Sequence, residues 1–152
     1  MRNLLELAIF KATIWHRGQV DKQGKPYILH PLAVMFRLQN EPEPVQIAAV
    51  LHDVVEDCGV PIATIKEFFG AEVASIVNVL TRYRGVEYED YIRSIKAHPV
   101  ANRIKLADLA ENLREDRPID DALGARYVKA VAVLTGMLPL VYEDVVVASG
   151  QD

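Results

Sequence analysis

The sequence predicts an all-α fold, a compact single-domain helical bundle of about eight helices. Apolar residues recur at helical spacing almost throughout, and outside the last turn of the sequence no stretch of four or more residues alternates strictly between apolar and polar. The composition agrees with one ordinary globular core, because the chain has 152 residues of which 51% are apolar and 25% charged.

The first predicted helix has one apolar face and ends in a loop. That face consists of Leu5, Ala8, Ile9, Ala12 and His16. Two glycines and a proline break the helix in the loop that follows, residues 17–27. A second helix opens at His30 and Pro31, where the missing N–H of proline costs nothing, and runs to about Asn40.

The third predicted helix, Val45 to Asp57, is apolar almost all round through Val55, so we expect it to be central. Four further helices are predicted over residues 62–69, 71–80, 87–96 and 100–113, and the last helix over residues 122–138. The last helix contains Tyr127, whose neighbours at helical spacing suit a core. In the tail after it, which is not assigned, Leu140 and residues 145–147 would suit a subunit interface.

Charge and hydropathy exclude several classes of partner. A net charge of −4 argues against a nucleic acid polymer, but it permits a small anionic substrate, because a bound cation can dominate the charge of a site. The longest apolar stretch, residues 128–142, is interrupted by Lys129 and Pro139 and is too short for a membrane span. The single cysteine, Cys58, and the lack of a cleavable leader pattern predict a cytoplasmic protein, and a homo-oligomer is left open.

The most informative feature is the adjacent pair His52 and Asp53 within the apolar third helix. Burying ionisable side chains without a partner costs several kcal/mol, so something must compensate for both. A divalent metal would do so, since imidazole and carboxylate together suit Mn, Fe or Zn. Glu56 and Asp57 follow four residues later on the same flank, which makes a purely solvated surface cluster a poor explanation.

A second polar stripe lies on the helix predicted over residues 100–113. Lys105, Asp108 and Asn112 form it, beside an apolar stripe of leucines. Plain amphipathicity, with Asp108 pointing at water, is the alternative interpretation. His16, at the C-terminal end of the first helix, is open to the alternative of a hydrogen-bonded core histidine.

The order His16, His52-Asp53 and Asp108 resembles the HD superfamily, in which such a set binds one divalent metal. More narrowly, the stretches HRGQ, GKPYILHPLAV, AAVLHDVVED, FGAEV, LTR and IKLADLAENL are similar to the hydrolase domain of the RelA/SpoT family and its small stand-alone relatives. The similarity runs from about residue 4 to about residue 115. Residues 1–152 are therefore interpreted as a single HD hydrolase domain, completed by a C-terminal helix and tail over residues 118–152.

The resemblance implies roles for individual residues. It implies His16, His52, Asp53 and Asp108 as ligands of one divalent ion, most often Mn²⁺ in the family, with Zn²⁺, Fe²⁺ or Mg²⁺ as alternatives. It implies Glu56 and Asp57 as the acidic catalytic pair beside the reacting phosphate and Asn112 near the ribose. Further candidates for substrate contacts are Lys105, Arg82 and Lys25. We assign no chemistry to Cys58, and interpret His30 as structural and His98 as a loop residue.

The resemblance also implies an activity, the removal of the 3′-pyrophosphate from guanosine polyphosphates, which converts ppGpp to GDP and pyrophosphate. In such chemistry a metal polarises the phosphate while Glu56 or Asp57 orients water or takes its proton. Two alternatives remain open. One is an HD-type phosphatase acting on another nucleotide or a phosphorylated cofactor, and the other is a nucleotide-binding module without catalysis.

Overall fold

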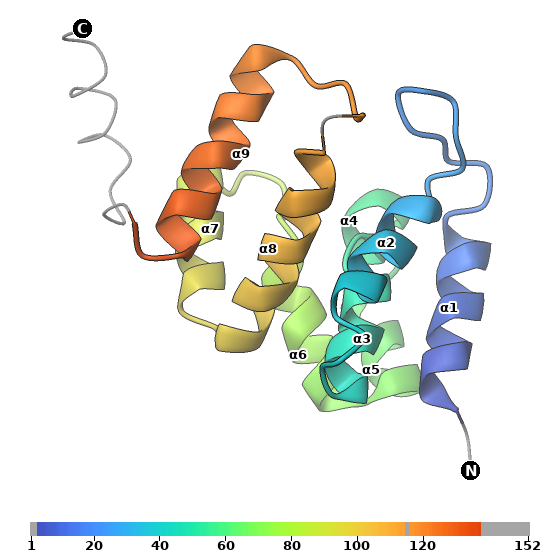
Figure 1. Cartoon of the computed structure of the whole chain (residues 1–152). Helices are drawn as coiled ribbons and strands as arrows, with labels where there is room; N and C mark the ends of the chain where they lie inside the picture. The colour runs from blue at the N-terminus through green and yellow to red at the C-terminus, as the bar shows by residue number, and fades with distance from the viewer. Residues whose placement is uncertain (1–2, 115, 138–152) are drawn as a thin grey trace, which may run out of the picture.

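The computed structural model describes residues 3–114 and 116–137, and these form an all-helical fold, as predicted (Figure 1). An isolated antiparallel bridge joins Val20 to Pro26 in the loop after the first helix. The helices are α1 (Leu4–Trp15), α2 (Leu29–Arg37), α3 (Glu43–Val50), α4 (Val54–Cys58), α5 (Ile62–Phe69), α6 (Ala71–Leu80), α7 (Tyr88–Lys96), α8 (Pro99–Asn112) and α9 (Asp121–Leu134).

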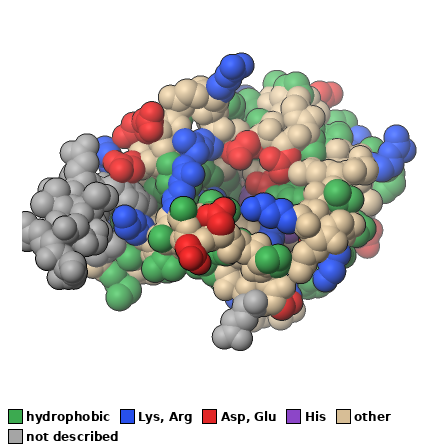
Figure 2. Space-filling view, turned by 90° about the horizontal axis from the view of Figure 1, so that it is seen from above, with side chains coloured by type: hydrophobic (Ala, Val, Ile, Leu, Met, Phe, Trp, Pro, Cys, Tyr) green, Lys and Arg blue, Asp and Glu red, His purple; other side chains and the backbone are tan. Residues whose placement is uncertain are grey.

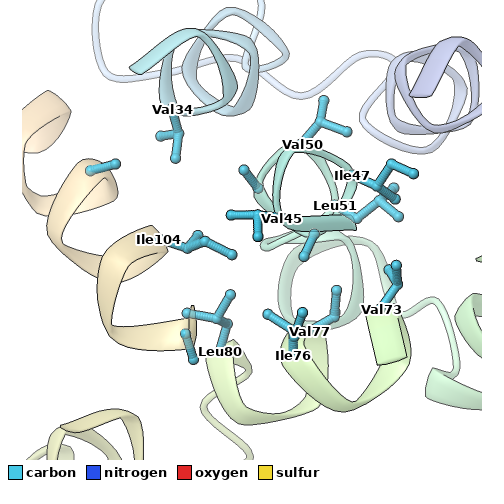
Figure 3. Close-up of a cluster of buried hydrophobic side chains, with 14 of the residues drawn as sticks. Val34, Val45, Ile47, Val50, Leu51, Val73, Ile76, Val77, Leu80 and Ile104 are labelled. Atoms are coloured by element: carbon cyan, nitrogen blue, oxygen red, sulfur yellow. The ribbon is translucent and has the colours of Figure 1, made fainter. Parts of the chain in front are cut away.

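Helix α3 lies at the centre of the core, as its all-round apolar sequence predicts. It contacts α1, α2, α6 and α8, and its residues Ile47 and Val50 are fully or almost fully buried. Figure 3 shows side chains from α2, α3, α6 and α8 converging on one cluster, in which Ile104 of α8 faces the helix-α3 side chains. Helix α8 thereby connects α7 and α9 to the rest of the molecule.

The predicted third helix is broken where the chemistry lies, which corrects the expectation of one helix from Val45 to Asp57. Helix α3 ends at Val50, and residues 51–53 form a turn before α4 begins at Val54. The N–H of Val54 donates to the carbonyl oxygen of Leu51 at 3.2 Å, a tighter pattern than the α-helix has. Periodicity cannot reveal this break, because apolar residues continue on both sides of it.

Polar side chains fix the starts of the helices that frame the core. The side chain of Asn3 accepts a hydrogen bond from the N–H of Glu6 at the start of α1. Asp120 accepts from the N–H of Leu123 in the same way at the start of α9. His98, predicted as a loop residue, is the N-cap of α8, and its Nδ1 accepts from the N–H of Ala101.

A buried carboxylate ties α2 to the end of α8. Glu111 accepts a hydrogen bond at 2.6 Å from Nε of Arg37 and another at 2.9 Å from Nη1 of Arg114. Burial acts to raise the pKa of Glu111, but these two arginines outweigh it and hold the pKa below its usual value. The ion pair between Arg37 and Glu111 therefore stabilises the packing of α2 on α8 while Glu111 is ionised.

We expect Glu111→Gln to lower the free energy of unfolding by about 1 kcal/mol at neutral pH, since the arginines are partly exposed and screened by water. A carboxyl whose pKa is lowered by folding stabilises the protein above its unfolded-state pKa, about 4.3 for Glu. That stabilisation is lost as the pH falls through the folded-state pKa. Urea unfolding at a series of pH values should show variant and wild type converging in acid, and a constant difference would contradict this explanation.

Two further expectations concern a membrane span and a subunit interface. No helix among residues 3–114 and 116–137 is both long and apolar enough to cross a membrane. The candidate interface residues Leu140 and 145–147, together with Leu138, lie outside the described residues.

Candidate metal centre

Buried ionisable side chains meet where the turn after α3, the start of α2 and the middle of α8 come together. Within this group, one ligand atom each from His30, His52 and Asp108 lie within 4.8 Å of one another, and all three residues are buried. In Figure 2, acidic and basic side chains surround a hollow on this end of the molecule, and histidine is visible inside it. The fold thus buries several ionisable side chains next to one another, where apolar side chains would be expected.

His52 is held with one ring nitrogen available. Its Nδ1 donates to the carbonyl oxygen of Ala49 at 2.6 Å, which leaves Nε2 with the lone pair in the neutral ring. That Nε2 is buried without a hydrogen-bond partner, at 3.1 Å from Oδ2 of Asp53 and 3.5 Å from Oδ1 of Asp108. Burial acts to lower the pKa of His52, but these carboxylates raise it well above its usual value, because they favour positive charge at this position.

The two aspartates approach the same point from different elements. Asp53, in the turn after α3, accepts a hydrogen bond from the hydroxyl of Tyr27 at 2.7 Å. Asp108, on α8, is bound at 2.8 Å by Nζ of Lys105 and at 3.2 Å by Nδ2 of Asn112. Burial acts to raise the pKa of Asp108, but Lys105 and the histidines outweigh it, so the pKa lies well below its usual value. The predicted polar stripe of α8 therefore faces the interior and not water.

His16 lies at the C-terminal end of α1, beside this cluster. Its Nδ1 is 2.8 Å from Oε1 of Gln19, and its Nε2 is buried without a hydrogen-bond partner. The ring stands next to that of Tyr27, with the two centroids 5.2 Å apart. Since the hydroxyl of Tyr27 reaches Asp53, this tyrosine lies between His16 and the carboxylates.

His30, interpreted from the sequence as structural, lies inside the cluster. Nη1 of Arg117 donates to its Nδ1 at 2.9 Å, so its proton is on Nε2, which donates to Oδ1 of Asp108 at 2.8 Å. A ring nitrogen that donates its N–H to a carboxylate orients that carboxylate, and it has no lone pair with which to bind a metal. The hydrogen bonds therefore separate His30, which holds Asp108, from His16 and His52, whose Nε2 atoms are free.

The donor set fits a divalent cation. His16 and His52 each offer a buried nitrogen that lacks a partner, and Asp53 and Asp108 offer carboxylate oxygens. Two imidazoles and two carboxylates suit Mn, Fe or Zn, and they leave positions open on a six-coordinate ion. The hydrogen bonds from Nδ1 of both histidines are of the kind that fixes the tautomer of metal-binding imidazoles.

The acidic pair Glu56 and Asp57 stands next to this cluster on α4. Oε1 of Glu56 accepts from the backbone N–H of Arg82 at 2.7 Å, and Oδ2 of Asp57 accepts from Nε2 of Gln19 at 3.3 Å. Burial raises the pKa of both carboxyl groups, and the charge of Asp53 adds to the effect. A raised pKa brings a carboxyl group closer to the pH range in which it can exchange protons with a substrate.

Two cavities near the cluster share a wall formed by Leu123 and Tyr127. One, of about 230 Å³, has apolar and polar walls that include Tyr27, Asn112 and Ile119. The other, of about 180 Å³, is lined by polar and aromatic residues. Its lining residues are Asp53, Glu56, Arg82, Tyr88, Tyr91, Lys105, Leu123, Arg126 and Tyr127.

The predicted substrate contacts fall in different places. Asn112 lines the larger cavity, and Arg82 and Lys105 line the smaller one. Lys25 lines neither of the two, but a third cavity on the other side of His30, next to Arg114. Its role as a substrate contact stays a prediction.

Several polar residues of this site carry no local sequence signal. The guanidinium carbon of Arg126 lies 3.7 Å from the ring centroid of Tyr88, and that of Arg82 lies 5.4 Å from the same centroid. The hydroxyl of Tyr88 is buried in this region without a hydrogen-bond partner. Arg126 and Arg117 come from the C-terminal part of the chain, far in sequence from the residues they contact, so only the fold reveals them.

Comparison with known proteins finds relatives for most of the chain. The model of the HD domain family matches residues 8–115. The guanosine-3′,5′-bis(diphosphate) 3′-pyrophosphohydrolase MESH1 of Danio rerio is 37% identical over 123 residues, which cover 74% of this chain and 68% of that protein.

Much longer relatives match as well. A guanosine-3′,5′-bis(diphosphate) 3′-pyrophosphohydrolase of Aquifex aeolicus is 36% identical over 110 residues, covering 65% of this chain and 16% of the relative. A GTP pyrophosphokinase of Streptomyces coelicolor is 34% identical over 125 residues, covering 74% of this chain and 15% of the relative. The chain thus spans only a small part of the length of these two proteins.

The fold is shared with a solved structure. A metazoan ortholog of SpoT, described as hydrolysing ppGpp, matches with a TM-score of 0.74 and 27% sequence identity. The match covers 88% of this chain and 86% of that one. The similarity therefore extends over the helical arrangement as well as the short motifs.

Proposed function

The chain belongs to the HD domain family, and from this membership we propose that it is a metal-dependent 3′-pyrophosphohydrolase of guanosine polyphosphates. The relatives named for this activity support the substrate, and this chain covers 68% of MESH1 of Danio rerio and 86% of the metazoan SpoT ortholog. We further propose that the chain acts as a single hydrolase domain in the cytoplasm.

The observation that carries the proposal is that Asp53 of the donor cluster lines one of two adjoining cavities, which share Leu123 and Tyr127. The larger cavity is of a size and polarity that suit a nucleoside, with the aromatic rings of Tyr27 and Tyr127 in its wall. The smaller one presents Arg82, Lys105 and Arg126, whose charges complement phosphate groups. A nucleotide whose base and ribose occupied the first cavity would extend its phosphates past the cluster into the second.

His16, His52, Asp53 and Asp108 are the residues that would hold the divalent ion, for which we propose Mn²⁺. When bound, such an ion supplies Lewis acidity beside the reacting phosphate. His30 and Lys105 hold Asp108 in place through its two oxygens, and Tyr27 holds Asp53. The protein thereby fixes the carboxylates before the ion arrives, so little reorganisation is needed.

The acidic pair accounts for the proton movements that hydrolysis requires. Water adds to the phosphorus nearest the ribose and gives a proton to Asp57, the bond from that phosphorus to the 3′-oxygen breaks, and the 3′-oxygen takes a proton, which gives GDP and pyrophosphate. Glu56 lines the phosphate-binding cavity, and its raised pKa suits it to give that proton. Arg82, Arg126 and Lys105 offset the charge that develops on the phosphoryl oxygens.

The test is to incubate the protein with ppGpp and Mn²⁺ and to separate the products by anion exchange. We expect GDP and pyrophosphate in equal amounts, no turnover after removal of metal with EDTA, and recovery when Mn²⁺ is returned. Release of orthophosphate instead would indicate a phosphatase. Metal binding without turnover of ppGpp would overturn the substrate assignment.

We expect Arg126→Met to raise the KM for ppGpp about 10-fold with a smaller change in kcat, because one charge-assisted hydrogen bond to phosphate is lost. Arg103→Met is the matched control, since Arg103 is a half-exposed arginine of α8 that pairs with Glu41 outside the two cavities. Steady-state kinetics of both variants measures the difference. An unchanged KM in Arg126→Met would remove this residue from the phosphate pocket.

A further inference from the structure

Gln19 occupies a fixed position in the loop between α1 and α2. Its backbone N–H donates to the carbonyl oxygen of His16 at 2.9 Å, and its own carbonyl oxygen accepts from the N–H of Tyr27 at 2.9 Å. The side chain is half-buried, and it also lines the larger cavity. The backbone on both sides of Gln19 is therefore anchored to residues of the site.

The two ends of the Gln19 amide bind different members of the site. Its Nε2 donates to Oδ2 of Asp57, and its Oε1 lies 2.8 Å from Nδ1 of His16. The NH₂ end of the amide therefore faces Asp57, since an amide nitrogen can only donate hydrogen bonds. The oxygen end then faces His16, and the ring nitrogen that it meets must carry the proton.

This arrangement determines the tautomer of His16. With the proton on Nδ1, the lone pair is on Nε2, which is buried and has no hydrogen-bond partner. His30 shows the opposite arrangement, because the donor Arg117 at its Nδ1 places the proton on Nε2. The partner at Nδ1 thus decides which histidine offers a free Nε2 to the cluster.

The thiol of Cys58 is the other group near this nitrogen, with Sγ 3.2 Å from Nδ1 of His16. A thiol is a weak donor and a weak acceptor, whereas an amide oxygen is a strong acceptor. Gln19 is therefore the partner that sets the tautomer.

We infer that Gln19 is a positioning residue, whose single amide fixes His16 as a metal ligand and holds Asp57 in the acidic pair. The inference deepens the proposed function, and its functional meaning rests on the metal centre proposed there. It assigns to one side chain the coupling between the metal site and the proton-transfer groups, which approach from different helices.

The tautomer of His16 can be measured without metal or substrate. In ¹⁵N-labelled protein at a pH of about 8, where histidine is usually neutral, proton-bearing and lone-pair nitrogens give well-separated resonances. We expect wild-type His16 to show its proton on Nδ1 and Gln19→Met to show a mixture of tautomers. Cys58→Ala should keep the wild-type pattern. A proton on Nε2 in the wild type would overturn the inference.

Two substitutions of Gln19 separate its two contacts. Gln19→Met removes both hydrogen bonds at nearly constant size, and we expect Mn²⁺ affinity to fall about 10- to 100-fold by calorimetry. Gln19→Glu keeps an oxygen facing His16 but sets a second carboxylate against Asp57. We expect that variant to retain most of the metal affinity while its kcat falls about 10-fold, because Asp57 is displaced.

Gln39→Met is the matched control, since Gln39 is exposed just after α2 and lines neither cavity. It should match the wild type in tautomer, affinity and kcat. Wild-type Mn²⁺ affinity in Gln19→Met, or equal loss of affinity in Gln19→Met and Gln19→Glu, would overturn the inference. If the wild type turned over no ppGpp, the proposed substrate would fail, whereas the tautomer and metal affinities would still decide the role of Gln19.

Discussion

Asp53→Asn is expected to lower the rate of ppGpp hydrolysis about 1000-fold, because loss of metal-supplied charge stabilisation costs several kcal/mol and each 1.4 kcal/mol is about a factor of 10. Asp53 contributes a charged oxygen 3.1 Å from Nε2 of His52. An amide in its place can still accept the hydrogen bond from Tyr27, which now reaches Oδ2 at 2.7 Å. The substitution therefore removes charge from the cluster while leaving its packing intact.

Calorimetric titration with Mn²⁺ and product analysis with ppGpp measure the two consequences on the same protein. We expect the metal affinity to fall at least about 100-fold together with the activity. Asp90→Asn is the matched control, because Asp90 is an exposed aspartate of α7 that pairs only with Arg93 among the described ion pairs. If Asp53→Asn bound Mn²⁺ and hydrolysed ppGpp like the control, Asp53 would not be a ligand.

The fold was predictable because helical periodicity extends along most of the sequence. The helix predicted over 62–69 agrees with α5 and that over 71–80 with α6, since Gly70 separates two apolar runs at that point. The break at His52 was not predictable in the same way. A turn within a continuous apolar run is imposed by tertiary packing, and it leaves the spacing of the residues unchanged.

The candidate site was predictable where its residues stand in short motifs. His52, Asp53 and Asp108 come into contact in the structure, and each is an ionisable residue that interrupts apolar neighbours in the sequence. The role of His30 depends on Arg117, which is distant in sequence, and on the fold that brings Asp108 to its other nitrogen. A single sequence contains no signal for such a hydrogen-bond chain.

Lys105→Met is expected to destabilise the metal-free protein by about 3 kcal/mol, because it removes one partner of a buried ion pair. Nζ of Lys105 lies 2.8 Å from Oδ2 of Asp108, and the two side chains are only 13% and 6% exposed. Without the lysine, Asp108 would keep a buried charge close to Asp53. For a domain of this size the change corresponds to a melting temperature lower by roughly 10 °C.

Mn²⁺ distinguishes this electrostatic explanation from a loss of packing. A divalent ion at the cluster would compensate the charge of Asp108, so we expect Mn²⁺ to raise the melting temperature of Lys105→Met more than that of the wild type. Lys66→Met, at an exposed position of α5, should melt like the wild type with and without metal. Adding Asp108→Asn to Lys105→Met should restore part of the lost stability, because no uncompensated charge then remains. A deficit that neither Mn²⁺ nor the second substitution reduced would mean that Lys105 stabilises the fold through its packing against Tyr91 and not through its charge.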